Sequence, residues 1–210
     1  PPGSAGYALQ FDGNNDYVRL PQTTSIFGSG WETTKTVELW VRPDGPAPVC
    51  QYPNPAWCDA IFGDRPRWWG ISRGIINGQD RIWIWNLDSN APDQIAIEYT
   101  PDQWVHIALV HSNDTLRAYK NGIEVGSVVS GTTQQPTLGA LPVLQLGGVI
   151  NSSSRNWTFQ GQIDEVRLWN TARSAEEIAS LRFQELVGDE AGLAAYYKMS
   201  DGSGLTLTDD

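Results

Sequence analysis

The sequence predicts an all-β domain, arranged as a two-sheet sandwich or a barrel, with one short helix near its C-terminal end. The 210 residues include 21 Gly and 13 Pro but only one Met, a composition typical of many short strands joined by turns. Segments in which apolar and polar residues alternate recur along the chain, between turn-forming clusters such as residues 12–15 and 113–114. At this length we expect one compact body.

The alternation predicts the strands in order. It places them at residues 7–11, 16–20, 35–42, 58–63, 67–73, 81–86, 94–99, 103–111, 143–148, 160–169 and 192–198. The clearest hairpin joins residues 115–120 to 123–129 through Asn121 and Gly122, because Asn-Gly between alternating strands favours a type I′ turn.

One segment has helical periodicity instead. Ser174 and Glu177 form the sequence pattern of a capping box, and Ile178 and Leu181 follow at the i, i+3 spacing of a helix face. These signals predict a short helix over residues 175–181.

The charge excludes some partners. The chain carries 14 Lys and Arg against 24 Asp and Glu, a formal net charge of -10, which repels nucleic-acid phosphates and anionic lipid surfaces. No apolar run approaches the ~20 residues of a membrane span, so we expect neither a nucleic-acid partner nor membrane insertion. Residues 1–4 contain neither Met nor a signal-peptide core, and we expect a segment of a longer protein.

Cys50 and Cys58 are the two cysteines, and they flank a Pro-rich stretch. A disulfide between them would stiffen this loop and would indicate an oxidising, extracellular or cell-surface location. Two free thiols in a reducing compartment are the alternative. The sequons at Asn113, Asn151 and Asn156 do not distinguish the two.

Four stretches carry a resemblance to a known family. They are residues 8–18 (ALQFDGNNDYV), 36–43 (TVELWVRP), 103–110 (QWVHIALV) and 161–174 (GQIDEVRLWNTARS). Each is similar to a segment of the LamG-like jelly-roll group of the concanavalin A-like lectin/glucanase superfamily, in the same order. Each is a weak signal alone, but together they cover nearly the whole chain.

The resemblance implies a two-sheet antiparallel jelly-roll sandwich for residues 1–190. It also implies a binding module of a longer extracellular protein, often with a structural calcium ion, but it does not define the ligand. Residues 192–205, within the C-terminal segment 191–210, resemble the stretch with which repeats of this family begin. They would either start a following repeat or close this sandwich with an edge strand.

The family pattern also suggests where calcium would bind. The loop at residues 12–16 holds two carboxylates and two amide oxygens, and the resemblance places the Asp164 region nearby. Oxygen ligands of this kind suit Ca²⁺, so we predict Asp12 and Asp164 as ligands, with Asp16 as a second choice. The alternative is that Asp12 only forms an Asx-turn and Asp164 only caps a bulge.

The ten Trp residues indicate a function more directly than the candidate calcium loop does. In residues 81–85, Arg81, Trp83 and Trp85 lie on the strand face opposite Ile82 and Ile84. The same split between an aliphatic face and a face with Trp and charge recurs in residues 37–42, where Trp40 lies opposite the aliphatic residues.

Sugar rings stack on indoles while their hydroxyls bind Asp and Arg, so this mixture predicts a carbohydrate site on a concave sheet face. The predicted ligand-binding residues are Trp57, Asp64, Arg65, Arg67, Trp68, Trp69, Arg81, Trp83 and Trp85. A protein partner would use the same residue types, which makes an adhesion or spacer repeat the alternative. Any of these Trp side chains could instead be buried, as we expect for Trp40, Trp104 and Trp169.

An enzymatic function has less support. Glucanases of this fold carry acids in the pattern Glu-x-Asp-x-x-Glu on one strand, and this pattern is absent. Glu38 stands alone, and the adjacent Asp164 and Glu165 would face opposite ways unless a bulge intervenes. His106 and His111 lie near no nucleophile motif, and we expect both to be structural. The sequence therefore predicts a non-catalytic module.

Overall fold

A computed structural model describes residues 7–51, 54–65, 69–87, 92–130, 143–150 and 156–200. Statements on the structure refer to these residues. They form two antiparallel sheets packed as a sandwich, which confirms the predicted fold class.

The first sheet has seven strands, in the order β1-β14-β3-β8-β9-β10, with β15 also paired to β14. The strands are β1 (Leu9–Asp12), β3 (Thr34–Pro43), β8 (Val105–Ser112), β9 (Thr115–Lys120), β10 (Ile123–Val129), β14 (Gln160–Trp169) and β15 (Leu193–Tyr197). Because β15 pairs with β14, the C-terminal stretch up to Tyr197 adds a strand to this sandwich.

The second sheet has eight strands, in the order β12-β13-β4-β5-β6-β7, with β11 joining β4 to β2. The strands are β2 (Val18–Gln22), β4 (Asp59–Arg65), β5 (Trp69–Ile76), β6 (Gln79–Leu87), β7 (Pro92–Ile97), β11 (Val143–Leu146), β12 (Gly148–Ile150) and β13 (Asn156–Thr158). The predicted strand 143–148 is split at Gly147, whose φ of 72° places it in the left-handed region.

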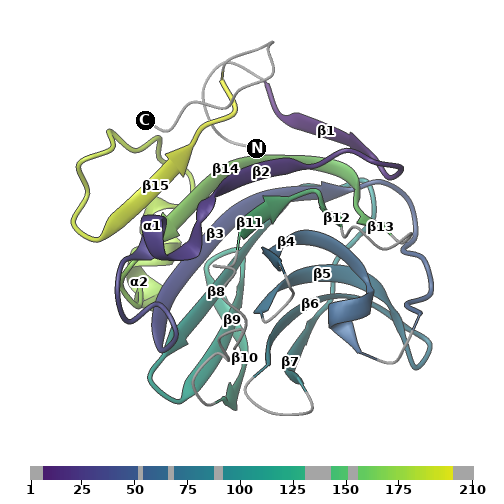
Figure 1. Ribbon diagram of the computed structural model, residues 1–210, viewed down its shortest axis with the longest axis horizontal. Coiled ribbons are helices and arrows are strands. Elements are labelled where there is room, and N and C mark those ends of the chain that lie inside the picture. Colours follow the sequence, from purple (N-terminus) through teal and green to yellow (C-terminus); the bar gives the residue numbers. More distant parts are fainter. Residues whose placement is uncertain are drawn as a thin grey trace.

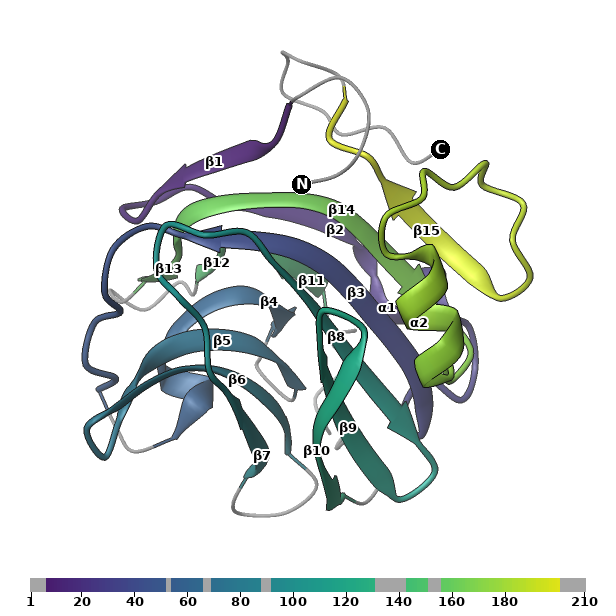
Figure 2. The same cartoon turned by 180° about the vertical axis from the view of Figure 1, so that it is seen from behind.

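Both sheets curve in the same direction. Figure 1 shows β14 and β3 on the outside of the bend and β4, β5 and β6 on its inside, and Figure 2 shows the same nesting from behind. The eight-stranded sheet therefore has a concave face turned away from the seven-stranded sheet, and we call it the concave face.

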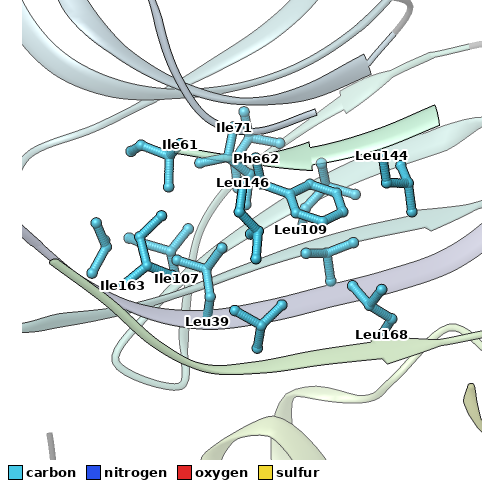
Figure 3. Packing of buried hydrophobic residues seen from close by; sticks show 14 of the residues in the cluster. Leu39, Ile61, Phe62, Ile71, Ile107, Leu109, Leu144, Leu146, Ile163 and Leu168 are labelled. Carbon is cyan, nitrogen blue, oxygen red and sulfur yellow. The ribbon is translucent and has the colours of Figure 1, made fainter. Parts of the chain in front are cut away.

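The core lies between the two sheets. It consists of alternate side chains from both, since every second residue of a strand faces inward. Figure 3 shows Leu39, Ile163 and Leu168 of the seven-stranded sheet facing Phe62 and Ile71 of the other. All five side chains are buried.

Three short helices accompany the sheets. The predicted one is α2 (Ala175–Leu181), with the Ser174 and Glu177 capping box in place. The sequence analysis missed α1 (Thr23–Phe27) and the 3-10 helix η1 (Pro55–Trp57). Neither begins with a capping box, and β-branched residues open α1, so no sequence signal favoured it. No helix in the described ranges has the length and apolar character of a membrane span.

The outer face of the seven-stranded sheet is also covered. Trp40 and Trp169 are buried there, as predicted, whereas Trp104 is only half-buried. Trp40 donates a hydrogen bond from Nε1 to the carbonyl of Arg182, just after α2. Over Trp40, this face is therefore covered by α2 and the segment after it.

One end of the core contains a buried cation. Lys35 Nζ donates to the carbonyl of Trp31 at 2.9 Å, lies 3.3 Å from His111 Nδ1, and sits 4.7 Å from the centroid of a Trp69 ring. Burial lowers the pKa of Lys35 to about 7, an effect that the charges of Asp64 and Glu32 partly oppose.

We predict that Lys35 makes stability depend on pH. Between about pH 7 and 10.5 the unfolded chain holds more protons on this amine than the folded protein does, so the free energy of unfolding rises with pH. Lys35→Met should stabilise the protein at pH 7 and flatten the rise between pH 7 and about 9 in urea titrations. Lys120→Met, at a half-buried position, is the control. A Lys35→Met slope equal to that of the wild type would contradict this assignment.

Candidate binding face

The strand register defines which residues share the concave face. Ile71, Ile82 and Ile84 point into the core, so their strand neighbours point the other way. The residues on the concave face are Ala60 and Gly63 of β4, Gly70, Ser72, Gly74 and Ile76 of β5, Gln79, Arg81, Trp83 and Trp85 of β6, Gln94 and Ala96 of β7, and Val143 and Gln145 of β11. Glu98, the next residue on this face, follows the end of β7.

Trp83 and Trp85 lie against a stretch of β5 that carries only small residues on the concave face, Gly70, Ser72 and Gly74. Trp83 donates from Nε1 to the carbonyl of Gly74 at 3.0 Å, and Trp85 donates from Nε1 to Ser72 Oγ at 2.8 Å. A Cβ on Gly70 would come within 3.4 Å of the Trp85 ring. The two indoles therefore pack over β5 because this strand alternates glycine and serine on the concave face.

A disulfide loop covers these two indoles. Cys50 and Cys58 are bonded, which confirms the predicted disulfide. The cysteines and Ala56 pack with Trp83 and Trp85 in one hydrophobic cluster, so the two rings are only 6% and 2% exposed. The disulfide encloses residues 50–58; the described part of this loop, residues 50–51 and 54–58, carries η1, which packs on β5, β6 and β7. We call it the disulfide loop; the short blue helix in Figures 1 and 2 belongs to it.

Several bonds hold the disulfide loop in place. At its start, the Cys50 N–H donates to the carbonyl of Ile75, and the Ile75 N–H donates to the carbonyl of Pro48. Asn54 Oδ1 accepts from the Ala56 N–H and caps η1. On the chain-entropy view, a disulfide over so short a loop contributes roughly 2–3 kcal/mol. The described ends of the loop are therefore held against the concave face.

The structure corrects part of the predicted contact set. Trp69 and Asp64 point into the core and are fully buried, and Asp64 Oδ1 accepts from the Trp69 N–H. Trp83 and Trp85 do face the concave side, but the disulfide loop covers them. These four residues can support a ligand site from behind and cannot touch a ligand in this arrangement.

The other predicted contacts are less closely defined. Arg81 is partly exposed and pairs with Glu98, with 3.0 Å between Nη2 and Oε1. Trp57 lies in η1 and Arg65 ends β4, but their side chains are outside the described part of the structure. Arg67 and Trp68 lie wholly outside it.

The sequence analysis missed two features of this face. The first is the row of Gly70, Ser72 and Gly74, which receives the indoles and is readable as small residues at every second position of a strand. The second is the outer side of β7, where Gln94 and Ala96 are exposed. Both follow from the same alternation that identified Trp83 and Trp85.

The carboxylates on this face do not form a hydrolytic pair. Among the described residues Glu98 is the carboxylate on the concave side, whereas Asp59, Asp64, Asp80 and Asp93 lie on the core side by register. Glycoside hydrolysis needs two carboxyl groups, about 5–5.5 Å or about 6.5–9.5 Å apart. The described concave face therefore carries no pair of carboxyl groups at either distance.

The predicted calcium ligands are not brought together. Asp12 pairs in register with Gln160, so Asp164 lies four residues further along β14, roughly 13 Å away at ~3.3 Å per residue. The Asp12 carboxylate accepts from the backbone N–H and the side-chain amide of Asn14, which is an Asx-turn, and Asp16 accepts from the Asp12 N–H. Across the described ranges no three His, Cys, Asp or Glu side chains gather as a metal site.

Asp164 has a structural explanation instead. It is buried at a bulge in β14 where Glu165 has a φ of 52°, and its Oδ1 accepts from the Glu165 N–H at 2.8 Å. Glu165 in turn binds Arg167 and the Tyr196 hydroxyl. The bulge that would alter the facing of Asp164 and Glu165 is present. The residues proposed for Ca²⁺ do not fit it as a set, and the ion itself stays a prediction.

Comparison with protein families gives a match over most of the chain. The family Laminin_G_3, described as the concanavalin A-like lectin/glucanases superfamily, matches residues 12–179. Pappalysin-1 of Mus musculus is 26% identical over 189 residues, which cover 85% of this chain and 11% of pappalysin-1. The chain thus spans about a tenth of this relative.

Two solved structures show the same fold. A protein of Bacteroides ovatus ATCC 8483, provisionally assigned as carbohydrate binding, aligns with a TM-score of 0.71 at 18% identity, over 96% of this chain and 54% of that one. Domain 4 of AbnA, an extracellular arabinanase of Geobacillus stearothermophilus, was solved with arabinotriose. It aligns with a TM-score of 0.55 at 24% identity, over 86% of this chain and 79% of that one.

We predict that Gly74 is required for the seating of the disulfide loop. A Cβ at this position would lie 2.2 Å from Cys50 Sγ, so Gly74→Ala has to displace the disulfide and should lower the free energy of unfolding by about 1–3 kcal/mol in urea titrations. Gly63→Ala, whose Cβ would meet backbone at 3.3 Å, should cost less. Equal losses of unfolding free energy in Gly74→Ala and Gly63→Ala would argue against this packing.

We also predict that Asp164 is destabilising at neutral pH. Burial raises its pKa from 3.8 to about 7, so its contribution to stability is full below pH 3.8 and is lost as the pH rises toward 7. Asp164→Asn should therefore raise the melting temperature at pH 8 and change it little at pH 4, in EGTA or in Ca²⁺. If Ca²⁺ instead raises the melting temperature of the wild type, and both Asp164→Asn and Asp12→Ala abolish that rise, the result would support the calcium site.

Proposed function

Because this chain belongs to the concanavalin A-like lectin/glucanase superfamily, we propose that it is a non-catalytic carbohydrate-binding module of a larger secreted or cell-surface protein. The match over residues 12–179 establishes the family and leaves the ligand open. Two neighbours in the fold support the choice of carbohydrate, one provisionally assigned as carbohydrate binding and one solved with arabinotriose.

The observation that carries this proposal is the disulfide loop seated on Trp83 and Trp85 in the middle of the concave face. Weak ligands such as sugars bind better to surfaces that are already rigid, since less conformational entropy is lost on binding. A loop fixed by a disulfide, two indoles and backbone hydrogen bonds is such a surface, and it carries Trp57 within η1.

We propose the following division of roles. Trp57 and Trp68 would supply the apolar surface for a sugar ring, and Arg65, Arg67 and Arg81 would donate hydrogen bonds to its hydroxyls or to an acidic group. The buried members of the predicted set would act from beneath the binding surface, by supporting the loops that present the contact residues. These members are Asp64, Trp69, Trp83 and Trp85.

The absence of an acid pair on the described concave face supports binding without catalysis. The disulfide favours an oxidising location outside the cytosol. The short span of pappalysin-1 that aligns is consistent with one module among several in a longer chain.

A second candidate is an adhesion repeat that binds another protein domain. The observation that favours it is the edge strand β10, where Ile123, Val125 and Val129 are exposed. This surface belongs to the seven-stranded sheet, so the two candidate functions involve different strands and can be separated by mutation.

The test of the proposed function is affinity electrophoresis in gels that contain linear arabinan, laminarin or xylan. We expect at least one polymer to retard the wild type, and Trp57→Ala or Trp68→Ala to weaken its binding about tenfold, as loss of one stacking contact should. Phe183→Ala is the control. It removes an aromatic ring that is 51% exposed just after α2, away from the concave face, and this variant should bind like the wild type. No retardation by any polymer would reject the proposal and leave adhesion as the better candidate.

A further inference from the structure

The two histidines of β8 lie on opposite faces of the seven-stranded sheet and have opposite partners. His106 lies on the outer face, with its Nε2 3.4 Å from Glu38 Oε2. His111 lies on the core side, directly opposite Lys35 in the register of β3 and β8, with its Nδ1 3.3 Å from Lys35 Nζ. Both imidazoles are buried. A protonated imidazole would therefore face a carboxylate at His106 but an ammonium group at His111.

The contact between Lys35 and His111 accommodates one positive charge. An ammonium group only donates hydrogen bonds, so the contact assigns His111 Nδ1 as the acceptor and its imidazole as neutral. If the imidazole took up a proton, Nδ1 would carry its own hydrogen, and two cations would lie 3.3 Å apart between the sheets. Their repulsion would act in a buried site, where little water screens it.

Further hydrogen bonds connect this pair to the other sheet. Lys35 Nζ also donates to the carbonyl of Trp31 at 2.9 Å. With its hydrogen on Nε2, His111 donates to the carbonyl of Ser130 at 3.2 Å. The Ser130 hydroxyl accepts from Asn86 Nδ2 at 2.8 Å, and Asn86 belongs to β6. A buried chain of hydrogen bonds therefore runs from β3 through β8 to the eight-stranded sheet.

The charges around the pair keep Lys35 protonated in mild acid. Burial lowers the pKa of Lys35 to about 7, while the buried carboxylate of Asp64 on β4 and that of Glu32 before β3 oppose this effect. The inward residues that α1, β5, β6, β9, β10 and β11 place at this end of the core carry no charge; they are Phe27, Trp69, Asn86, Leu116, Val128 and Leu144. In mild acid the second proton would thus have to enter on His111.

Protonation of His111 would break the buried chain. To separate the two cations, either Lys35 leaves the Trp31 carbonyl or the imidazole turns and releases Ser130. In both cases the connection between the sheets is weakened at this end of the core. We infer that the Lys35–His111 pair is an acid-sensitive contact between the two sheets, which opens in mild acid because the folded protein holds one proton fewer here than the unfolded chain. The inference does not depend on the proposed function.

Urea titrations at pH 6.5 and at pH 5 test this inference. The unfolded chain protonates His111 below about pH 6.5 and the folded protein does not, so this residue should lower the folding equilibrium constant roughly tenfold between the two pH values. His111→Gln has no titrating group at this position, and its loss should be about tenfold smaller than that of the wild type. His106→Gln, at the other buried histidine of β8, is the matched control and should lose at least as much as the wild type. A His111→Gln variant with the pH dependence of the wild type would overturn the inference.

Two measurements on the wild type decide the same point if His111→Gln does not fold. Imidazole ¹⁵N NMR of the folded protein at pH 6 should show His111 neutral, with its hydrogen on Nε2, and an imidazolium signal would contradict the inference. The opening is read from hydrogen exchange. The Ser130 N–H, which donates to the carbonyl of Asp114 at 2.7 Å, should lose protection between pH 6.5 and pH 5 relative to the Leu168 N–H of β14. Equal changes in protection at both amides would show that this contact does not open.

Discussion

The packing of two indoles from β6 onto the glycine and serine positions of β5 is the contact on which the concave face depends. Trp83 and Trp85 fit there because Gly70 and Gly74 leave the backbone of β5 open, and each indole N–H finds a partner on that strand. An indole can be buried at low cost when its N–H is satisfied. The flat apolar layer that results supports the disulfide loop, and without it the loop would have no surface to bury.

The two outer faces of the sandwich differ in which segments cover them. The seven-stranded sheet is covered by α2 and the segment after it, through hydrogen bonds that Trp40 donates to the carbonyl of Arg182 and Arg167 donates to the carbonyl of Leu181. On the concave face the described part of the disulfide loop covers Trp83 and Trp85, whereas Gln94 and Ala96 on the outer side of β7 are exposed. A face that is only partly closed suits a binding module, since the rigid part supports a ligand and the open part admits it.

The comparison of sequence and structure shows where pattern reasoning succeeds. The hairpin around Asn121 and Gly122 was predicted to the residue, and both have the positive φ that a type I′ turn needs. The capping box of Ser174 was equally clear. Alternation also assigned Trp83 and Trp85 to the outward face, but it could not show that residues 50–58 would cover them, because alternation describes one strand at a time. The calcium prediction was weaker for the same reason, since Asp12 and Asp164 come from strands whose register the sequence does not encode.

By itself, the sequence determined the class of fold, most of the strands and the α2 helix, because these follow from local periodicity and turn chemistry. It favoured a disulfide between the two cysteines over free thiols, and the structure shows that bond. Only the tertiary structure decided which aromatic residues are accessible. Trp69 was predicted to touch a ligand, but strand register sends it into the core between the sheets. Exposure depends on what packs against a side chain from distant parts of the chain, and that is a property of the assembled sheets.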